Sequence, residues 1–169
     1  PMPNDILARA QAGIDAMLAA LGPRKAGRVA GLGVAIPSEL WNWAEDLGFH
    51  RQALEAWRGF DIEAALRALY PFPVFLSNDG TCACGAELTF GGGKNYQDFI
   101  YFFVGSFAGG GVVLGRSLYS GRSGNAGALG SMPVPAPVGA ATPASRSVQL
   151  IKSASLVRLE ALLAENGAA

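Results

Sequence analysis

Two segments of the chain contain residues whose types and spacing could do chemistry. Asn78 and Asp79 follow the apolar run Pro73–Ser77 and stand where a strand turns into a helix. At such a turn these residue types typically cap the following helix, because their side-chain oxygens accept hydrogen bonds from its first amides. The second segment, Gly105–Gly130, holds nine glycines in 26 residues. Residues without a β-carbon let a phosphate group or another backbone approach the main chain closely.

The elements that must position these segments alternate between helices and strands. Asn4 is the expected cap of the first helix, and Asp61 is the expected cap of a later one. Apolar periodicity predicts helices over 4–21, 38–47, 51–57, 62–69, 81–89 and 148–166, and strands over 28–36, 74–76, 99–104 and 111–114. This order of elements indicates an α/β protein.

The two segments together resemble the ROK family of sugar kinases and repressors. Asn78 to Glu87 is similar to the family's NDANAAALAE-like helix start, Gly105 to Val113 to its GTGIGGGIV, and Leu118 to Val134 to its LxxGxxGxAGEIGHxxV. The resemblance extends in diluted form from about Val29 to Leu163. It implies a fragment of the actin-like, ribonuclease-H-like ATPase-domain fold that these sugar kinases use.

The resemblance implies ligand-binding roles for three polar residues. In a sugar kinase of this family the equivalent of Asp79 is the catalytic base, which takes the proton of the acceptor hydroxyl, and Asn78 would orient another hydroxyl. Helix capping remains the alternative for both residues. Pro37-Ser38-Glu39 stands where the family has Pro-Gly-Pro near the sugar, so Glu39 would replace a lost carboxylate. The alternative for Glu39 is an ordinary residue of the first helical turn.

The same resemblance makes the glycine-rich turn a candidate phosphate site. The family's Gly-Thr-Gly turn supplies amide donors to nucleotide phosphates, which makes Gly105, Gly109 and Gly110 the candidate phosphate-binding residues. Phe107 occupies the position of the second glycine, where its ring would block a phosphate, and this argues against ATP binding. Close strand packing is the alternative explanation for the run from Gly109 to Gly111.

The sequence departs from the family at its sugar and metal positions. The family's GEIGH is here Gly127 to Ser131, so Ala128 replaces a sugar-binding carboxylate and Ser131 replaces a zinc-binding histidine. Ile151 stands at a second sugar-binding glutamate, and no cysteine cluster follows. Structural zinc needs four ligands. We therefore expect no zinc, no other metal and no cofactor.

The histidine and the two cysteines have ordinary structural explanations. His50 is the only histidine and is expected at the surface or at a helix end. Cys82 and Cys84 are two residues apart on a predicted helix, where their side chains diverge and a disulfide would be strained. Both are expected to be small buried residues.

Composition and charge limit the classes of partner. Thirteen basic and thirteen acidic residues cancel, and no run of either sign forms a nucleic-acid footprint. No apolar run approaches the ~20 residues of a membrane span, so we expect a cytoplasmic protein without membrane contact. The expected organisation is a remainder of the amino-terminal lobe over 1–76, a carboxyl-terminal lobe core over 77–147 with a mobile loop over 132–147, and a terminal helix over 148–169.

The resemblance favours a regulator over an enzyme. No DxGxT phosphate turn and no winged helix-turn-helix precede the first helix, so the chain looks like a fragment without a DNA-binding domain. We expect the sugar-sensing, kinase-like effector domain of a transcriptional regulator similar to N-acetylglucosamine and xylose repressors. Its partners would be a small sugar or sugar-derived effector, DNA through a domain absent from this chain, and a possible second copy in a homodimer. The alternatives are an ATP-dependent sugar kinase and a purely structural dimerisation module.

Overall fold

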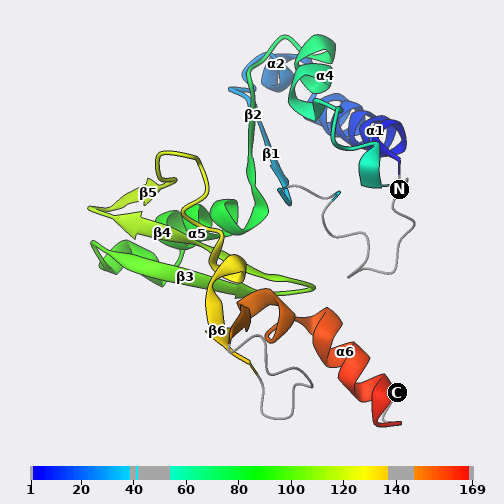
Figure 1. Ribbon diagram of the computed structural model, residues 1–169. Helices are drawn as coiled ribbons and strands as arrows, with labels where there is room; N and C mark the ends of the chain where they lie inside the picture. Colours follow the sequence, from blue (N-terminus) through cyan, green and yellow to red (C-terminus); the bar gives the residue numbers. More distant parts are fainter. Residues whose placement is uncertain (1, 39–40, 42–53, 137–146, 168–169) are drawn as a thin grey trace. The chain divides into compact units, whose positions relative to one another are not determined.

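The computed structural model describes residues 2–38, 41, 54–136 and 147–167 (Figure 1). The chain divides into two compact units, Pro1–Asn78 and Asp79–Ala169. The helix predicted over 38–47 lies almost entirely outside the described residues, as do Glu39 and His50. Of the helix predicted over 51–57 the structure describes residues 54–57, of which 54 and 55 are helical and 56 and 57 form a turn.

The helices of the first unit begin at residues whose chemistry suits a helix start. Its complete helices within the described residues are α1 (Pro3–Leu21), α2 (Pro23–Ala26) and α4 (Ile62–Leu69). The prediction that Asn4 caps α1 is wrong, because the helix begins at Pro3, whose missing amide hydrogen and restricted φ suit a first helical position. The predicted cap of α4 is confirmed: the Asp61 carboxylate accepts a hydrogen bond from the Ala64 amide at 2.9 Å.

A pair of parallel strands completes the first unit. Strand β1 (Leu32–Ile36) pairs with β2 (Val74–Asn78), and Leu32 lies opposite Val74. The strand predicted over 28–36 is too long at its start, because the amides of Arg28 and Val29 donate to carbonyls of α2 and close a turn instead. The core of the unit consists of large side chains from helices, strand and loop, namely Ile14, Leu54, Trp57, Ile62, Leu66 and Val74.

The second unit begins with a helix and an antiparallel sheet. Its first elements are α5 (Asp79–Phe90), the short 3-10 helix η2 (Gly92–Asn95), β3 (Phe99–Val104), β4 (Ala108–Leu114) and β5 (Ser117–Tyr119). The sheet order is β3-β4-β5, and β3 has the predicted bounds. Helix α5 starts two residues earlier than predicted, so Asp79 lies inside its first turn.

The rest of the second unit differs most from the prediction. It consists of η3 (Leu129–Ser131), β6 (Pro133–Pro135), β7 (Ser147–Gln149), η4 (Leu150–Lys152) and α6 (Leu156–Glu165). The mobile loop predicted over 132–147 is wrong at its ends, because β6 pairs there with β7; residues 137–146 lie outside the described residues. The helix predicted over 148–166 begins only at Leu156, because the preceding residues form β7 and η4 and Ser155 then caps α6.

Candidate functional site

Asn78 ends strand β2 and makes a polar contact with the segment that follows β1. Its side-chain amide donates a hydrogen bond to the Ser38 hydroxyl oxygen at 3.2 Å. The carboxyl ends of parallel strands are where ligands commonly bind in α/β sheets. Ser38 was not among the site residues predicted from the sequence. The one available signal was its place in Pro37-Ser38-Glu39, where the family pattern has a glycine.

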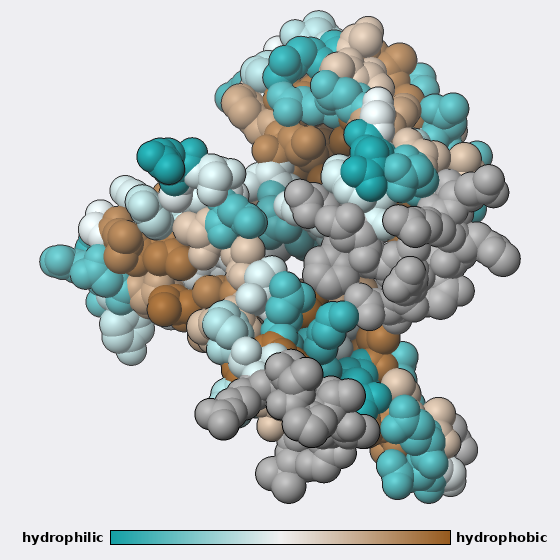
Figure 2. Space-filling model, viewed as in Figure 1, coloured by the Kyte–Doolittle hydropathy of each residue, from teal (hydrophilic) through white to brown (hydrophobic). Residues whose placement is uncertain are grey.

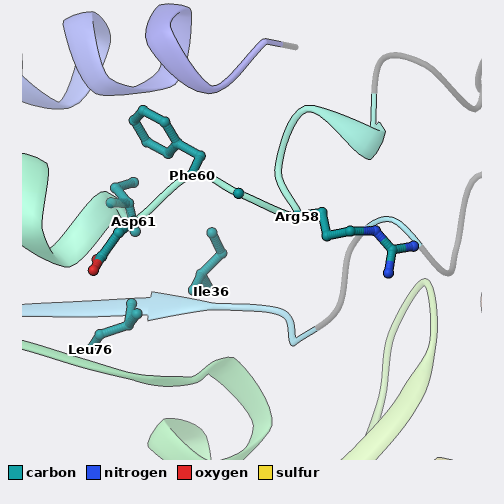
Figure 3. A pocket seen from close by; sticks show the side chains of 7 residues that line it. Ile36, Arg58, Phe60, Asp61 and Leu76 are labelled. Atoms are coloured by element: carbon teal, nitrogen blue, oxygen red, sulfur yellow. The ribbon is translucent and has the colours of Figure 1, made fainter.

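A cavity of about 350 Å³ lies near the same ends of β1 and β2 (Figure 3). Ile36 and Leu76 line it together with the segment from Arg58 to Ile62. In Figure 3 the Arg58 side chain points away from Phe60 and Asp61.

The two charged residues of this cavity already have protein partners. The Arg58 guanidinium forms an ion pair with Glu55 and lies over the Trp41 ring, 5.3 Å from its centroid, and the Asp61 carboxylate caps α4. The wall of the cavity is therefore mainly apolar.

Asp79, the predicted catalytic base, is the first residue of α5 and is half-buried. One of its carboxylate oxygens accepts a hydrogen bond from the Gly80 amide at 2.9 Å. This contact agrees with the capping alternative, because it gives an acceptor to one of the unpaired amides at the amino end of a helix. A carboxylate has two oxygens and about four acceptor positions, so the contact is compatible with binding a ligand hydroxyl as well.

Backbone amide and carbonyl groups of the turn between β3 and β4 form hydrogen bonds with other groups of the protein. The Gly105 amide donates to the Phe107 carbonyl at 3.0 Å. The Gly105 and Ser106 carbonyls accept hydrogen bonds from the Leu156 and Val157 amides, at 2.9 and 3.4 Å, and so hold the amino end of α6. A phosphate site needs amide donors directed at the ligand, whereas here the Gly105 amide is engaged and the carbonyls face a helix end.

Two of the three consecutive glycines of β4 stand where a side chain has no room. A β-carbon at Gly110 would lie 1.9 Å from the Tyr101 carbonyl oxygen, and one at Gly111 would lie 2.4 Å from the β-carbon of Cys84 on α5. A β-carbon at Gly109 would meet no atom within 4 Å. Packing thus explains glycine at 110 and 111, whereas the phosphate-binding role of Gly105, Gly109 and Gly110 stays a prediction.

The segment from Gly127 to Gly130 lies directly on the backbone of β4. A β-carbon at Gly127 would lie 2.4 Å from the Gly110 carbonyl oxygen, and one at Gly130 would lie 2.1 Å from the Ala108 carbonyl oxygen. Ile151 contacts this segment and is buried. Ile151, which stands at one of the family's sugar-binding positions, therefore packs in the core of this unit.

Cysteines and other metal-binding side chains are scattered among the described residues. Cys82 and Cys84 are both free thiols on α5; Cys84 is buried as expected, whereas Cys82 is only partly buried. Burial, with a smaller contribution from the Glu87 charge, raises the pKa of the Cys84 thiol. In the described part of the chain, no three His, Cys, Asp or Glu side chains come together in a way that could hold a metal ion. Nor is any helix within these residues long and apolar enough to cross a membrane.

Comparison with known proteins identifies the family. The model of the ROK family matches residues 3–146, which is most of the chain. The chain therefore belongs to the ROK family.

Its relatives include both repressors and kinases. The xylose repressor of Bacillus subtilis is 33% identical over 78 residues, which cover 46% of this chain and 20% of that protein. The glucokinase of Streptomyces coelicolor is 34% identical over 74 residues, which cover 44% of this chain and 23% of the glucokinase. The chain thus spans less than a quarter of either curated relative in these matches.

The fold also matches a solved kinase. The ROK hexokinase of Thermus thermophilus superposes with a TM-score of 0.59 at 28% identity, covering 85% of this chain and 46% of the hexokinase. The α/β fold of ROK sugar kinases, predicted from the sequence, is thereby confirmed.

Proposed function

We propose that this chain is the kinase-like effector domain of a ROK transcriptional regulator, which binds a small sugar or sugar-derived effector in the cytoplasm and transfers no phosphate. The proposal rests on the hydrogen bonds formed by the turn between β3 and β4. Its Gly105 amide is bonded to the Phe107 carbonyl, and its Gly105 and Ser106 carbonyls accept hydrogen bonds from α6. A nucleotide site needs several backbone amides directed at the phosphate, and the engaged Gly105 amide removes one of them, which favours a regulator over a kinase. DNA binding would belong to another domain of the regulator.

The proposed effector site uses polar groups that the chain retains. Asn78, Asp79 and Glu39 are its ligand-binding residues, and Ser38 joins them because it accepts a hydrogen bond from Asn78. The family's other ligand positions hold Ala128, Ser131 and Ile151. Each lost hydrogen bond to a charged group costs roughly 1.5–3 kcal/mol, so a sugar kinase's own substrate would bind weakly. A different polyhydroxylated compound is the expected effector.

Isothermal titration calorimetry and thermal-shift screening of sugars and sugar acids test this effector site. At least one compound should stabilise the wild-type chain, and Asp79→Ala should abolish the effect. Asp79→Ser is the matched variant, because a serine can cap α5 but carries no carboxylate. If the serine variant binds the effector as well as wild type does, Asp79 is only a cap and the ligand role fails. Asn4→Ala, at an exposed position of α1, is the control that should leave binding unchanged.

An ATP-dependent sugar kinase is the second candidate, favoured by the similarity to the S. coelicolor glucokinase and the T. thermophilus hexokinase. In that case Asp79 would be the catalytic base. A coupled assay over a panel of sugars with ATP distinguishes the candidates. We expect no turnover above background. Turnover of about 1 per second or more that disappears in Asp79→Asn would establish the kinase and reject the regulator.

The proposed domain holds neither zinc nor a nucleotide cofactor. Ser131 stands at the family's zinc-binding histidine, and the next residues that the structure describes are β-strand and loop without cysteine. Elemental analysis of the purified chain should therefore give far less than one zinc per molecule. One tightly held zinc per chain would contradict the alignment of Gly127 to Ser131 with the family pattern.

A further inference from the structure

The cavity at the ends of β1 and β2 shares a face of the sheet with Asn78. Ile36 lies opposite Asn78 in the parallel register, and Leu76 precedes Asn78 by two residues on β2. Side chains alternate along a strand, so Leu76 and Asn78 point to the same face, roughly 7 Å apart. In Figure 3 the Ile36 side chain points toward the segment that carries Phe60 and Asp61. The cavity and the polar end of β2 therefore lie beside each other within the first unit.

The walls of this cavity suit an apolar group. They extend from Ile62, a core residue that is 6% exposed, to Leu76, which is 39% exposed. Figure 2 shows hydrophobic surface where Figure 1 places β1 and β2. The Asp61 carboxylate and the Arg58 guanidinium have protein partners. A hydroxyl group buried here would lose hydrogen bonds to water, which costs free energy, whereas an apolar group would gain free energy on burial.

The polar groups beside the cavity suit a hydroxylated ligand. Asn78 donates a hydrogen bond to the Ser38 hydroxyl oxygen at 3.2 Å. Side-chain amides and hydroxyls are among the groups that orient small molecules in otherwise apolar pockets. The volume of about 350 Å³ is at the lower end of the range for ligand pockets, so the cavity has room for a small group beside a bound sugar.

We propose that this cavity is an apolar subsite of the effector site and that the effector is a glycoside. The sugar hydroxyls bind at Asn78 and Ser38, and a short alkyl or aryl group on the sugar enters the cavity. This subsite rests on the proposed function, because Asn78 must bind the sugar, and it names the class of effector.

Burial of the alkyl group supplies affinity that the sugar lacks. Each buried methylene strengthens binding about fourfold, so three methylenes give roughly 60-fold. A gain of this size offsets part of the affinity lost where Ala128 and Ile151 replace the family's sugar-binding carboxylates.

Isothermal titration calorimetry of the full 169-residue chain tests the subsite. The probes are the methyl, ethyl, propyl, butyl and phenyl glycosides of glucose, galactose, mannose and xylose in both anomeric forms, together with the free sugars. For at least one sugar and anomer, Kd should fall about fourfold with each methylene from methyl to butyl.

A substitution that fills the cavity sharpens this test. Gly59 lines the cavity, a β-carbon there would meet no atom within 4 Å, and its backbone is not left-handed. Gly59→Leu should therefore weaken binding of the butyl glycoside more than tenfold and of the methyl glycoside less than threefold. Gly13→Leu is the matched control, because Gly13 has equally open surroundings on α1, outside the cavity. It should bind both glycosides as wild type does.

Methyl NMR of the wild-type chain, labelled at the isoleucine δ1 carbons, shows where the group binds. The phenyl glycoside should shift the signals of Ile36 and Ile62, which line the cavity. Ile100 on β3 and the buried Ile151, both in the second unit, are the reference signals and should not move.

The outcomes separate this subsite from the proposed function. If free sugars bind and the alkyl series gains nothing, the subsite is rejected and the proposed function stands. If neither sugars nor glycosides bind, both are rejected. Equal losses for Gly59→Leu and Gly13→Leu, or shifts at Ile100 or Ile151 without shifts at Ile36 and Ile62, also reject the subsite, because the alkyl group then binds elsewhere.

Discussion

The two units of this chain reach close packing by opposite routes. In the first, the buried core is made mainly of large side chains, such as Trp57, Ile62 and Leu66. In the second, the buried residues among those described are mostly small or medium in size, with Cys84, Ala108 and Val113 the main ones on α5 and β4. There the backbones themselves approach, because glycines at 110, 127 and 130 lack the β-carbons that would hold them apart, and Gly111 makes room for the Cys84 side chain.

The difference predicts different sensitivities to substitution. A core of interlocking side chains loses stability when atoms are removed, because a cavity remains. A backbone-to-backbone contact loses stability when atoms are added, because nothing nearby can move aside without displacing main chain. The first unit should therefore be sensitive to truncation and the second to the addition of a methyl group.

Leu66→Ala should have the largest effect and should act on the first unit. Leu66 lies on α4 and is 1% exposed, so its truncation should lower the free energy of unfolding by about 2–5 kcal/mol. All three tryptophans lie between residues 41 and 57, so urea unfolding followed by tryptophan fluorescence reports on this unit. Leu69→Ala, on the same helix but exposed, is the control. A loss below 1 kcal/mol for Leu66→Ala would contradict the proposed core.

Gly110→Ala should cause the second largest loss of stability, and this loss should be confined to the second unit. The added methyl would overlap the Tyr101 carbonyl oxygen, and we expect a loss of about 3 kcal/mol. Hydrogen exchange of peptides from β3 and β4 should accelerate while tryptophan fluorescence stays unchanged.

Gly109→Ala is the matched control for this prediction. The neighbouring site has open space and no left-handed backbone, so the change should be neutral or stabilising by about 0.4–1 kcal/mol. Equal losses for Gly109→Ala and Gly110→Ala would remove the packing explanation of the glycine run.

The helix caps should contribute less to stability than Leu66 and Gly110 do, and they should contribute about equally in the two units. Asp61 accepts from the Ala64 amide at 2.9 Å, and Ser155 accepts from the Arg158 amide at 3.2 Å. Alanine at either position should cost about 1 kcal/mol, measured by chemical denaturation. Asp61→Asn preserves an acceptor oxygen and should recover most of the loss. If asparagine costs as much as alanine does, the Asp61 charge matters and the capping geometry does not.

The smallest expected effect is a difference in thiol reactivity that leaves the fold intact. Burial raises the pKa of Cys84, so less of this thiol is thiolate at any given pH, and its side chain is also inaccessible. Iodoacetamide at pH 8 should modify Cys82 at least roughly tenfold faster than Cys84. Mass spectrometry of Cys82→Ser and Cys84→Ser chains separates the two rates. Equal rates in native buffer would show that α5 does not stay packed on β4.

Local interactions account for most of the elements that were predicted correctly. Asp61 before an apolar stripe is sufficient to start α4, and six consecutive apolar and aromatic residues are sufficient for β3. The start of α6 could not be predicted in this way. Its amphipathic pattern continues back to Val148, but pairing with β6 draws residues 147–149 into a strand. That pairing joins segments separated along the chain, and a local pattern contains no information about it.

The same distinction between local pattern and long-range contact applies to the candidate site. The sequence by itself determined the family, the α/β class and the placement of Asn78 and Asp79 at the junction of a strand and a helix, because these depend on residue types at short spacing. Only the tertiary structure decided that Ser38 contacts Asn78, that the Gly105 amide is engaged by Phe107, and that Gly110 and Gly111 are packing positions. The physical reason is that a glycine suits both a phosphate and a neighbouring backbone. The atom that fills the space beside it is known only once distant segments have folded together.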